Sequence, residues 1–284
     1  MKRLSPDEFD RRLRDLLSED IGAGDVTTDA TVAGDPPASG SFISRSPTVV
    51  SGLPVARRVF ELLDPEVSWQ EERGSGDSVE SGAVLARLSG RAREILTGER
   101  VALNLLQRMC GIATATRRFV EAVAGTGCCI LDTRKTAPGL RAFDRQAVRD
   151  GGGTNHRDGL YDAVLIKDNH LRLAGGVRSA VVRARGLVPP GMRIEVEVES
   201  EEELREAVAA KADAVLIDNQ SPETVRRWCR IAREADPAPW IEASGGIQLQ
   251  NVRSYAEAGP DAISIGALTH SVIAADIALE IESQ

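Results

Sequence analysis

The sequence predicts a two-domain α/β protein whose second domain is a parallel sheet covered by helices. Its 284 residues suit one large domain or two small ones. From residue 128 onwards, short apolar segments rich in β-branched residues alternate with helix-like segments, as in βα units. Each predicted strand of this region also ends in a charged residue or runs into glycine. An open doubly wound sheet fits the same alternation, but we favour a barrel, because its strand ends converge on one mouth.

The first domain is expected to span residues 1–110 and to mix helices with strands. Helical spacing of apolar residues predicts a helix over 4–19. The sequence then predicts strands within 39–52, a short helix over 54–64, a hairpin punctuated by glycine over 74–90 and a long helix over 93–125 that links the domains. A C-terminal helix at about 270–284 is expected to pack on this domain.

The barrel domain is expected to span residues 111–269. Its predicted strands are 128–133, 162–167, 193–199, 213–218, 239–243 and 261–266. The helix-like segments between them are 177–186, 201–211, 223–235 and 249–259.

Composition excludes several classes of protein. The net charge of −8 and the pI of about 5.1 argue against a protein that binds nucleic acid or an anionic membrane. No secretory signal and no apolar stretch of membrane-spanning length is visible. The four cysteines lack the spacing of a zinc site or of a disulfide framework. We therefore expect a cytoplasmic protein.

Lysine is scarce, with four lysines among 35 basic residues. Lys2 and Lys211 stand in polar surroundings typical of a solvated surface. Lys135 and Lys167 stand in segments dense in other reactive residues, where a compact ammonium would serve as a point charge that arginine cannot replace. Chance is the alternative explanation of the four positions.

Chemically useful groups follow all six predicted strands. Ion pairs that stabilise strand ends would explain one or two such groups but not six. In strand 193–199 the period of two puts Glu195, Glu197 and Glu199 on one face. The groups at the other strand ends are Arg134, Lys135, Lys167, Asp218, Ser244, Gly245, Gly246 and Gly266.

The predicted mouth combines anion-binding turns with cations. The SGGI and GALTHS segments each follow a strand and precede a helix, an arrangement that binds phosphate. Arg134, Lys135, His156, Arg157 and Lys167 would make the mouth strongly cationic, which implies a substrate with several negative charges. Glu197 and Asp218 would be either ion-pair partners or ligands of a divalent metal and of ribose hydroxyls. His170 and His270 are expected to position loops.

These residues carry a resemblance to a known family. The segment DTRKTAPGLRAFDRQAVRDGGGTNHRDGLYDAVLIKDNH (132–170), with ERVALNLLQRMCGIAT, EVEVES, LIDNQSPE, EASGGI and SIGALTHS, resembles quinolinate phosphoribosyltransferase. The resemblance implies an N-terminal α/β sandwich domain, an incomplete parallel α/β barrel, and at least a homodimer with shared active sites. The implied reaction converts quinolinate and phosphoribosyl pyrophosphate into nicotinate mononucleotide, pyrophosphate and CO₂ in NAD biosynthesis. It implies Mg²⁺, no organic cofactor, and neither a nucleic acid nor a membrane as partner.

The resemblance also implies residue roles. Arg134, His156, Arg157 and Lys167 match positions that hold the quinolinate carboxylates, and Arg100 matches an arginine from the neighbouring subunit. Lys135 matches a lysine near pyrophosphate, Glu197 and Asp218 match carboxylates facing ribose and metal, and Ser244, Gly245, Gly246 and Gly266 match the 5′-phosphate site. Among these residues, Lys135, Lys167, Glu197 and Asp218 are the expected catalytic groups. Val101 and Ser200 depart from the usual Thr and Asn without changing a charged contact.

Three other functions remain open at this stage. The nearest is a related nicotinate phosphoribosyltransferase, or the related protein found with molybdate transport systems. The second is a nucleotide or nucleic-acid binding module without enzymatic activity, which the acidic net charge disfavours. The third is an aldolase that forms a Schiff base through Lys167, which Asp168 and the nearby cations disfavour because they indicate a charged lysine.

Overall fold

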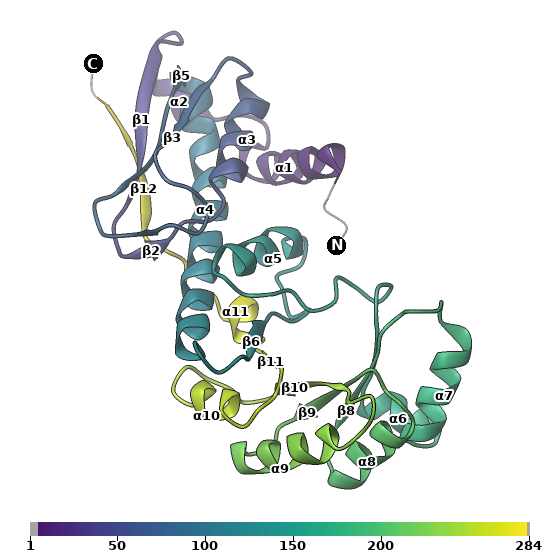
Figure 1. Ribbon diagram of the computed structural model, residues 1–284. Helices are drawn as coiled ribbons and strands as arrows, with labels where there is room; N and C mark the ends of the chain where they lie inside the picture. Colours follow the sequence, from purple (N-terminus) through teal and green to yellow (C-terminus); the bar gives the residue numbers. More distant parts are fainter. Residues whose placement is uncertain (1–4, 283–284) are drawn as a thin grey trace. The chain divides into compact units, whose positions relative to one another are not determined.

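The computed structural model describes residues 5–282, which divide into two compact units. The first unit comprises residues up to 117, residues 136–152 and residues from 268 onwards, and the second comprises 118–135 and 153–267. Figure 1 shows the helices and strands along the chain. Within the described residues, no helix combines the length and the apolar character that crossing a membrane requires.

The first unit contains a four-stranded antiparallel sheet in the order β12-β1-β5-β3. A separate antiparallel pair joins β2 to β4. The helices are α1 (Pro6–Ile21), α2 (Val26–Thr31), α3 (Leu53–Leu63), the start of α4 (Ala92–Ala122) and α5 (Arg141–Asp150). The strands are β1 (Pro37–Ser44), β2 (Thr48–Val49), β3 (Ser68–Glu71), β4 (Ser78–Val79), β5 (Val84–Arg91) and β12 (Ile277–Ile281).

The core of the first unit explains why its helices form where they do. Ser5 caps α1 in a reciprocal arrangement with Glu8, which satisfies amide groups that the first helical turn leaves unpaired. Phe42, Phe60 and Trp69 pack together with ring centroids 5.4 to 6.1 Å apart. Burial of these large rings fixes α3 against the sheet.

Two sequence predictions are wrong in this unit. Residues 74–90 do not form a hairpin, because β4 pairs with β2 whereas β5 pairs with β1 and β3. The C-terminal segment is strand β12, where we predicted a helix. Its apolar residues Ile277, Leu279 and Ile281 alternate with period two, and the free edge of β1 supplies the backbone partners.

The second unit contains a six-stranded parallel sheet in the order β6-β11-β10-β9-β8-β7. Its strands are β6 (Cys129–Leu131), β7 (Val164–Ile166), β8 (Ile194–Val198), β9 (Ala214–Asp218), β10 (Trp240–Ser244) and β11 (Ala262–Ser264). Its helices are α6 (Asp168–Ala174), α7 (Val177–Leu187), α8 (Glu201–Ala209), α9 (Pro222–Arg233) and α10 (Val252–Ala256). Helix α11 (Ala267–His270) follows β11 and, except for Ala267, belongs to the first unit.

The order of these strands is that of an incomplete barrel. Strands β7 to β11 lie side by side in sequence order, while β6, the first in the chain, pairs with β11. A closed barrel would pair β6 with β7, but these two strands are the edges of the sheet. The predicted α/β fold with an incomplete parallel barrel is therefore confirmed.

The two faces of this sheet differ in chemistry. In β8, Ile194, Val196 and Val198 occupy one face and Glu195 and Glu197 the other, and all five are buried. Helices α7, α8 and α9 lie against strands β8 to β10 (Figure 1) and cover the apolar face. The opposite, inner face combines buried glutamates with apolar residues such as Leu165 and Leu216, whereas most barrels of this kind have a packed apolar interior.

Aspartates at two strand starts have a structural role. Asp213 accepts a hydrogen bond from the Ile194 amide at 2.7 Å, and Asp261 accepts one from the Ile241 amide at the same distance. Each is also paired with an arginine of a covering helix, Asp213 with Arg185 and Asp261 with Arg233. These acids tie neighbouring strands together at the end opposite to the predicted mouth.

Candidate active site

Lys167 and Glu197 are in contact at the carboxyl ends of β7 and β8. The ammonium Nζ of Lys167 donates to Oε2 of Glu197. The parallel register of these strands, in which Ile166 pairs with Val196, brings the two residues side by side. The Glu197 side chain is 9% exposed and that of Lys167 is 45% exposed, so the ammonium lies at the surface of the inner face.

Arg134 and Arg157 form a pair of like charges. Burial, together with repulsion by Arg134, lowers the pKa of Arg157. The Nη1 of Arg157 donates to the Ala163 carbonyl at 3.1 Å. The Nε of Arg134 is buried and has no hydrogen-bond partner in the part of the chain that the structure describes. Two half-buried guanidinium groups with an unmet donor favour an anionic ligand, because burying them without one is costly.

His156 is held by two carboxylates of the inner face. Its Nε2 lies 3.3 Å from Oε2 of Glu195 and 3.2 Å from Oε2 of Glu242. Burial opposes a charge on the ring, but while Glu195 and Glu242 are both ionised their contacts with the ring outweigh burial and raise the pKa of His156 to about 10. The Nδ1 atom accepts the Arg157 amide at 2.8 Å.

Sequence reasoning missed Asp132, Asn155 and Glu242. Asp132 is fully buried and accepts hydrogen bonds from the His156 amide at 2.8 Å and from Nδ2 of Asn155 at 2.6 Å. The signal for Asp132 was an acid directly after an apolar strand, and that for Glu242 was an acid inside one. Both carboxylates contact His156, Asp132 at its backbone amide and Glu242 at its ring.

The predicted phosphate turn follows β10. Gly245 has a φ of 91°, and a Cβ atom there would lie 2.2 Å from Oδ1 of Asn219. Only glycine fits this close approach. Ser244 accepts the Asn219 amide at 2.9 Å through its carbonyl, and Asn219 donates to Asp218 at 2.6 Å. The turn is therefore joined to the end of β9, where Asp218 lies.

The other predicted residues occupy varied positions. Gly246, with a φ of 62°, is exposed in the same turn, and half-buried Gly266 follows β11. Lys135 is exposed next to Arg134. Arg100 lies on α4 in the first unit, with a side chain 58% exposed and 3.9 Å from Glu99. Of the remaining histidines, His170 accepts the Lys167 amide at 2.9 Å and so orders the start of α6.

Two groups of residues have the donor atoms for a divalent cation. Glu197 and Asp218 offer carboxylates at the ends of β8 and β9, and oxygen donors of this kind suit Mg²⁺. His156, Glu195 and Glu242 offer donors within 4.8 Å of one another, deeper in the sheet. Lys167 already neutralises Glu197, which leaves Asp218 as the more available carboxylate of the first group.

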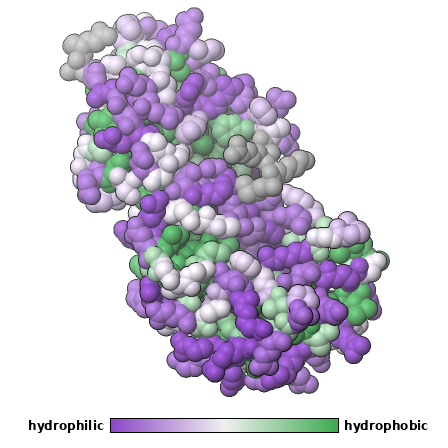
Figure 2. Space-filling view, in the orientation of Figure 1, coloured by the Kyte–Doolittle hydropathy of each residue, from purple (hydrophilic) through white to green (hydrophobic). Residues whose placement is uncertain are grey.

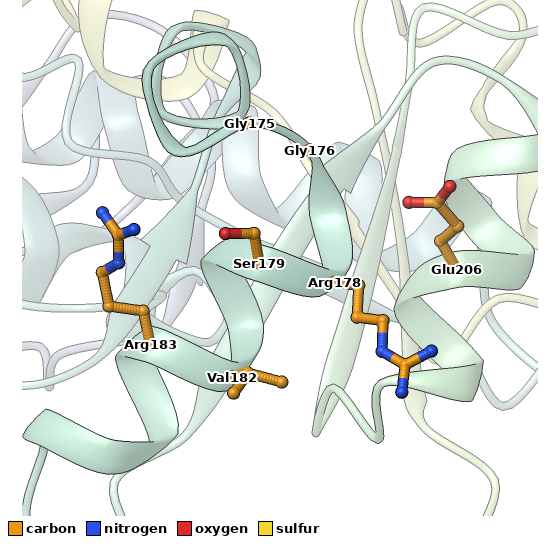
Figure 3. A pocket seen from close by; sticks show the side chains of 7 residues that line it. All are labelled: Gly175, Gly176, Arg178, Ser179, Val182, Arg183 and Glu206. Atoms are coloured by element: carbon orange, nitrogen blue, oxygen red, sulfur yellow. The ribbon is translucent and has the colours of Figure 1, made fainter.

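An open depression of about 620 Å³ lies elsewhere on the second unit, where α7 and α8 face solvent (Figure 3). Its polar lining consists of Arg178, Ser179, Arg183 and Glu206. Figure 3 shows the two arginines pointing in different directions rather than toward a common point. None of the predicted site residues lines it, and its lining side chains are not arranged to grip one ligand.

Comparison with known proteins gives one consistent result. Residues 25–110 match the N-terminal domain of quinolinate phosphoribosyl transferase, and residues 112–280 match its C-terminal domain. The nicotinate-nucleotide pyrophosphorylase (carboxylating) of Mycobacterium leprae is 43% identical in an alignment 290 residues long, gaps included, that covers 98% of this chain and 100% of that protein. A probable nicotinate-nucleotide pyrophosphorylase (carboxylating) of Bacillus subtilis is 42% identical over 275 residues, covering 96% and 93% respectively.

Solved structures agree with the sequence relatives. The nicotinate-nucleotide pyrophosphorylase of Francisella tularensis superposes with a TM-score of 0.92 at 38% identity, covering 99% of this chain and all of that one. The human nicotinic acid phosphoribosyltransferase superposes with a TM-score of 0.61 at 14% identity, covering 96% of this chain and 74% of that one. The latter likeness extends to the fold alone.

Proposed function

The chain belongs to the quinolinate phosphoribosyltransferase family of pentosyltransferases, and we propose that it performs the family's reaction with the side chains on the inner face of its parallel sheet. Quinolinate and phosphoribosyl pyrophosphate are converted into nicotinate mononucleotide, pyrophosphate and CO₂. The observation that supports the assignment of the site is the pair formed by Arg134 and Arg157: burial and the charge of Arg134 disfavour the charged form of Arg157, and Nε of Arg134 is buried without a hydrogen-bond partner among the described residues.

Quinolinate supplies the anion through its two carboxylates. Arg134, Arg157 and Lys167 would bind them, and each would gain a charge-assisted hydrogen bond. Lys167 would exchange Glu197 for a substrate carboxylate, which leaves Glu197 ready for the ribose. His156 would act on quinolinate mainly through the position of Arg157, because its Nδ1 accepts the Arg157 amide and its Nε2 lies between two carboxylates.

The glycine turn after β10 supports a role in binding the 5′-phosphate. Ser244, Gly245 and Gly246 would present backbone amides to the phosphate, together with Gly266 after β11. Lys135 would meet the pyrophosphate as an exposed cation. Glu197 and Asp218 would face the ribose, where their negative charge stabilises an oxocarbenium-like transition state.

The chemistry follows from this placement. The pyridine nitrogen of quinolinate forms a bond to ribose C1 as the bond from C1 to pyrophosphate breaks, and pyrophosphate leaves with the bonding electrons. The ring nitrogen becomes cationic and stabilises the electron pair that stays on the adjacent carbon when its carboxylate departs as CO₂, and a proton then binds to that carbon. The side chains contribute positioning and electrostatic stabilisation, so no organic cofactor is required.

Mg²⁺ would bind with the pyrophosphate of the substrate. The oxygen donors of Asp218 and Glu197 fit this ion, which commonly combines one or two carboxylates with substrate phosphates. When bound, it neutralises the charge of the leaving pyrophosphate. We expect Asp218 to contribute more than Glu197, since the latter is paired with Lys167.

We further propose a homodimer, at least, in which Arg100 serves the site of the neighbouring subunit. Large apolar side chains are exposed in the second unit, among them Leu160 at 76%, Tyr161 at 67% and Leu173 at 89%. Figure 2 shows apolar areas on the surface between polar ones, and such areas commonly form subunit contacts. All four cysteines are free, which suits a reducing cytoplasm.

Release of labelled CO₂ tests the function. Quinolinate labelled in its 2-carboxylate is incubated with the enzyme, phosphoribosyl pyrophosphate and Mg²⁺, and the gas is collected. Release that depends on phosphoribosyl pyrophosphate, with formation of nicotinate mononucleotide, is the expected result. Turnover of nicotinate alone would instead assign the chain to the nicotinate-specific relatives, and nucleotide binding without turnover would indicate a binding module.

A further inference from the structure

His156, Glu195 and Glu242 form a buried group on the inner face of the sheet, which we call the His156 cluster. Glu242 is fully buried, and neither of its carboxylate oxygens has a well-aligned hydrogen bond among the described residues. Nε2 of His156 lies 3.2 Å from Oε2 of Glu242, and the Ser264 side chain also interacts with this carboxyl group. A buried carboxylate in this setting is costly if it is ionised and acceptable if it is protonated.

The contacts of the imidazole locate its proton. The Arg157 amide donates to Nδ1, so Nδ1 presents a lone pair and carries no proton. The ring proton is therefore on Nε2, directed at the carboxylates of Glu195 and Glu242. A second ring proton would point at the amide hydrogen of Arg157.

The two carboxylates are in different surroundings. Oε1 of Glu195 lies 3.4 Å from the guanidinium of Arg193, which pairs with it as a cation. Among the residues that the structure describes, no arginine or lysine is paired with Glu242, and burial raises the pKa of its carboxyl group. A proton on Glu242, in addition to the one on Nε2 of His156, therefore fits these surroundings.

The same atoms are close enough together to surround a metal ion, but the proton argues against one. A nitrogen that ligates a metal must be free of its proton. Since Nδ1 already accepts an amide, a metal on Nε2 would leave the imidazole without any proton. The contacts therefore favour shared protons over coordination.

We propose that Glu242, as a neutral carboxylic acid, is a positioning residue for quinolinate binding. Glu242 and Glu195 fix Nε2 of His156, Nδ1 of His156 fixes the Arg157 amide, and the Arg157 guanidinium meets the substrate carboxylate. Asp132 holds the same segment from its other side through the His156 amide. This inference rests on the proposed function, since quinolinate is the ligand that Arg157 binds.

Two substitutions of nearly equal size separate a neutral acid from an anion. Glu242→Gln keeps an acceptor and a donor, whereas Glu242→Leu keeps the volume and removes both. Calorimetry of quinolinate binding should give an affinity within about threefold of wild type for Gln, and about tenfold or weaker for Leu, as one lost buried hydrogen bond implies. The affinity for phosphoribosyl pyrophosphate should change little in either variant, whereas general damage to the fold would weaken both ligands.

¹⁵N NMR of the histidine rings shows which ring nitrogens carry a proton, and the measurement does not depend on enzyme activity. The chain has three histidines, so His170→Gln and His270→Gln variants suffice to assign His156. One protonated and one unprotonated nitrogen on His156 at about pH 7 is expected. Two protonated nitrogens, or a Glu242→Gln variant that is folded but binds quinolinate as weakly as Glu242→Leu, would overturn the proposal. Absence of CO₂ release with the expected tautomer and binding would overturn only the proposed reaction.

Discussion

Lys167 and Glu197 form an ion pair across the neighbouring strands β7 and β8. The pair joins a cation proposed to bind quinolinate to a carboxylate proposed to face the ribose. Occupation of the site by quinolinate would therefore release the Glu197 carboxylate at the point where the ribose arrives. The compact ammonium of lysine can turn from the Glu197 carboxylate to a substrate carboxylate without moving far. The planar guanidinium of arginine is larger and binds best to a carboxylate that meets two of its N–H groups at once.

Lys167→Arg tests this requirement. The charge is kept, but kcat/KM for quinolinate should fall by about tenfold or more, as expected when a charge-assisted hydrogen bond loses its geometry. The measurement is CO₂ release at saturating phosphoribosyl pyrophosphate. Lys211→Arg, at an exposed position on the same unit, is the matched control and should retain wild-type activity. Equal activity of the two variants would show that the survival of lysine at position 167 is chance.

Nicotinate should be a poor substrate. It has one carboxylate, so it leaves either the arginine pair or Lys167 without its anion, at a cost of roughly 1.5–3 kcal/mol for each charged hydrogen bond. Such a cost corresponds to about 10- to 150-fold in kcat/KM. Parallel assays of nucleotide formation from both acids measure the ratio. Comparable values would contradict the assignment of Arg134 and Arg157 to two-carboxylate recognition.

Gly245→Ala should weaken the binding of phosphoribosyl pyrophosphate. The added Cβ would collide with Asn219 at 2.2 Å and would also be strained by the φ of 91°. Gly191→Ala separates the two effects, because Gly191 has a φ of 85° with no atom within 4 Å of the added Cβ. Both variants should lose about 1 kcal/mol of stability or more from backbone strain. Only Gly245→Ala should raise the KM for phosphoribosyl pyrophosphate, and a similar rise in both would mean that strain alone matters.

Mixed dimers test whether Arg100 acts in the neighbouring subunit. Arg100→Ala and Lys167→Ala should each be nearly inactive alone. In a mixed two-fold dimer one site carries both defects and the other none, so random reassociation of equal amounts should restore about a quarter of the sites. The two variants carry different tags, are dissociated together and reassociated, and CO₂ release is assayed. If tagging proves that heterodimers form and no activity returns, Arg100 serves its own chain.

The wrong predictions have a common cause. Residues 74–90 look like a local hairpin because glycine and alternating residues mark turns and strands, but the partners of β4 and β5 are the distant strands β2 and β1. Strand β12 differs from the predicted helix because its partner β1 lies more than 230 residues earlier in the chain, where no local pattern can indicate the pairing. Local patterns indicate that a strand exists, whereas pairing over such distances depends on the complete fold.

The sequence by itself determined the parallel sheet, its incomplete closure through the family resemblance, and the polar residues at the strand ends. Period-two alternation and the succession of strands and helices are local properties of the sequence, so they can be recognised without knowledge of the fold. Only the tertiary structure decided which groups meet: Lys167 with Glu197, Arg134 with Arg157, and His156 with Glu195 and Glu242. The sequence did not reveal Asp132 and Glu242, because the role of an acid in an apolar strand depends on whether it is buried and on which groups are buried beside it.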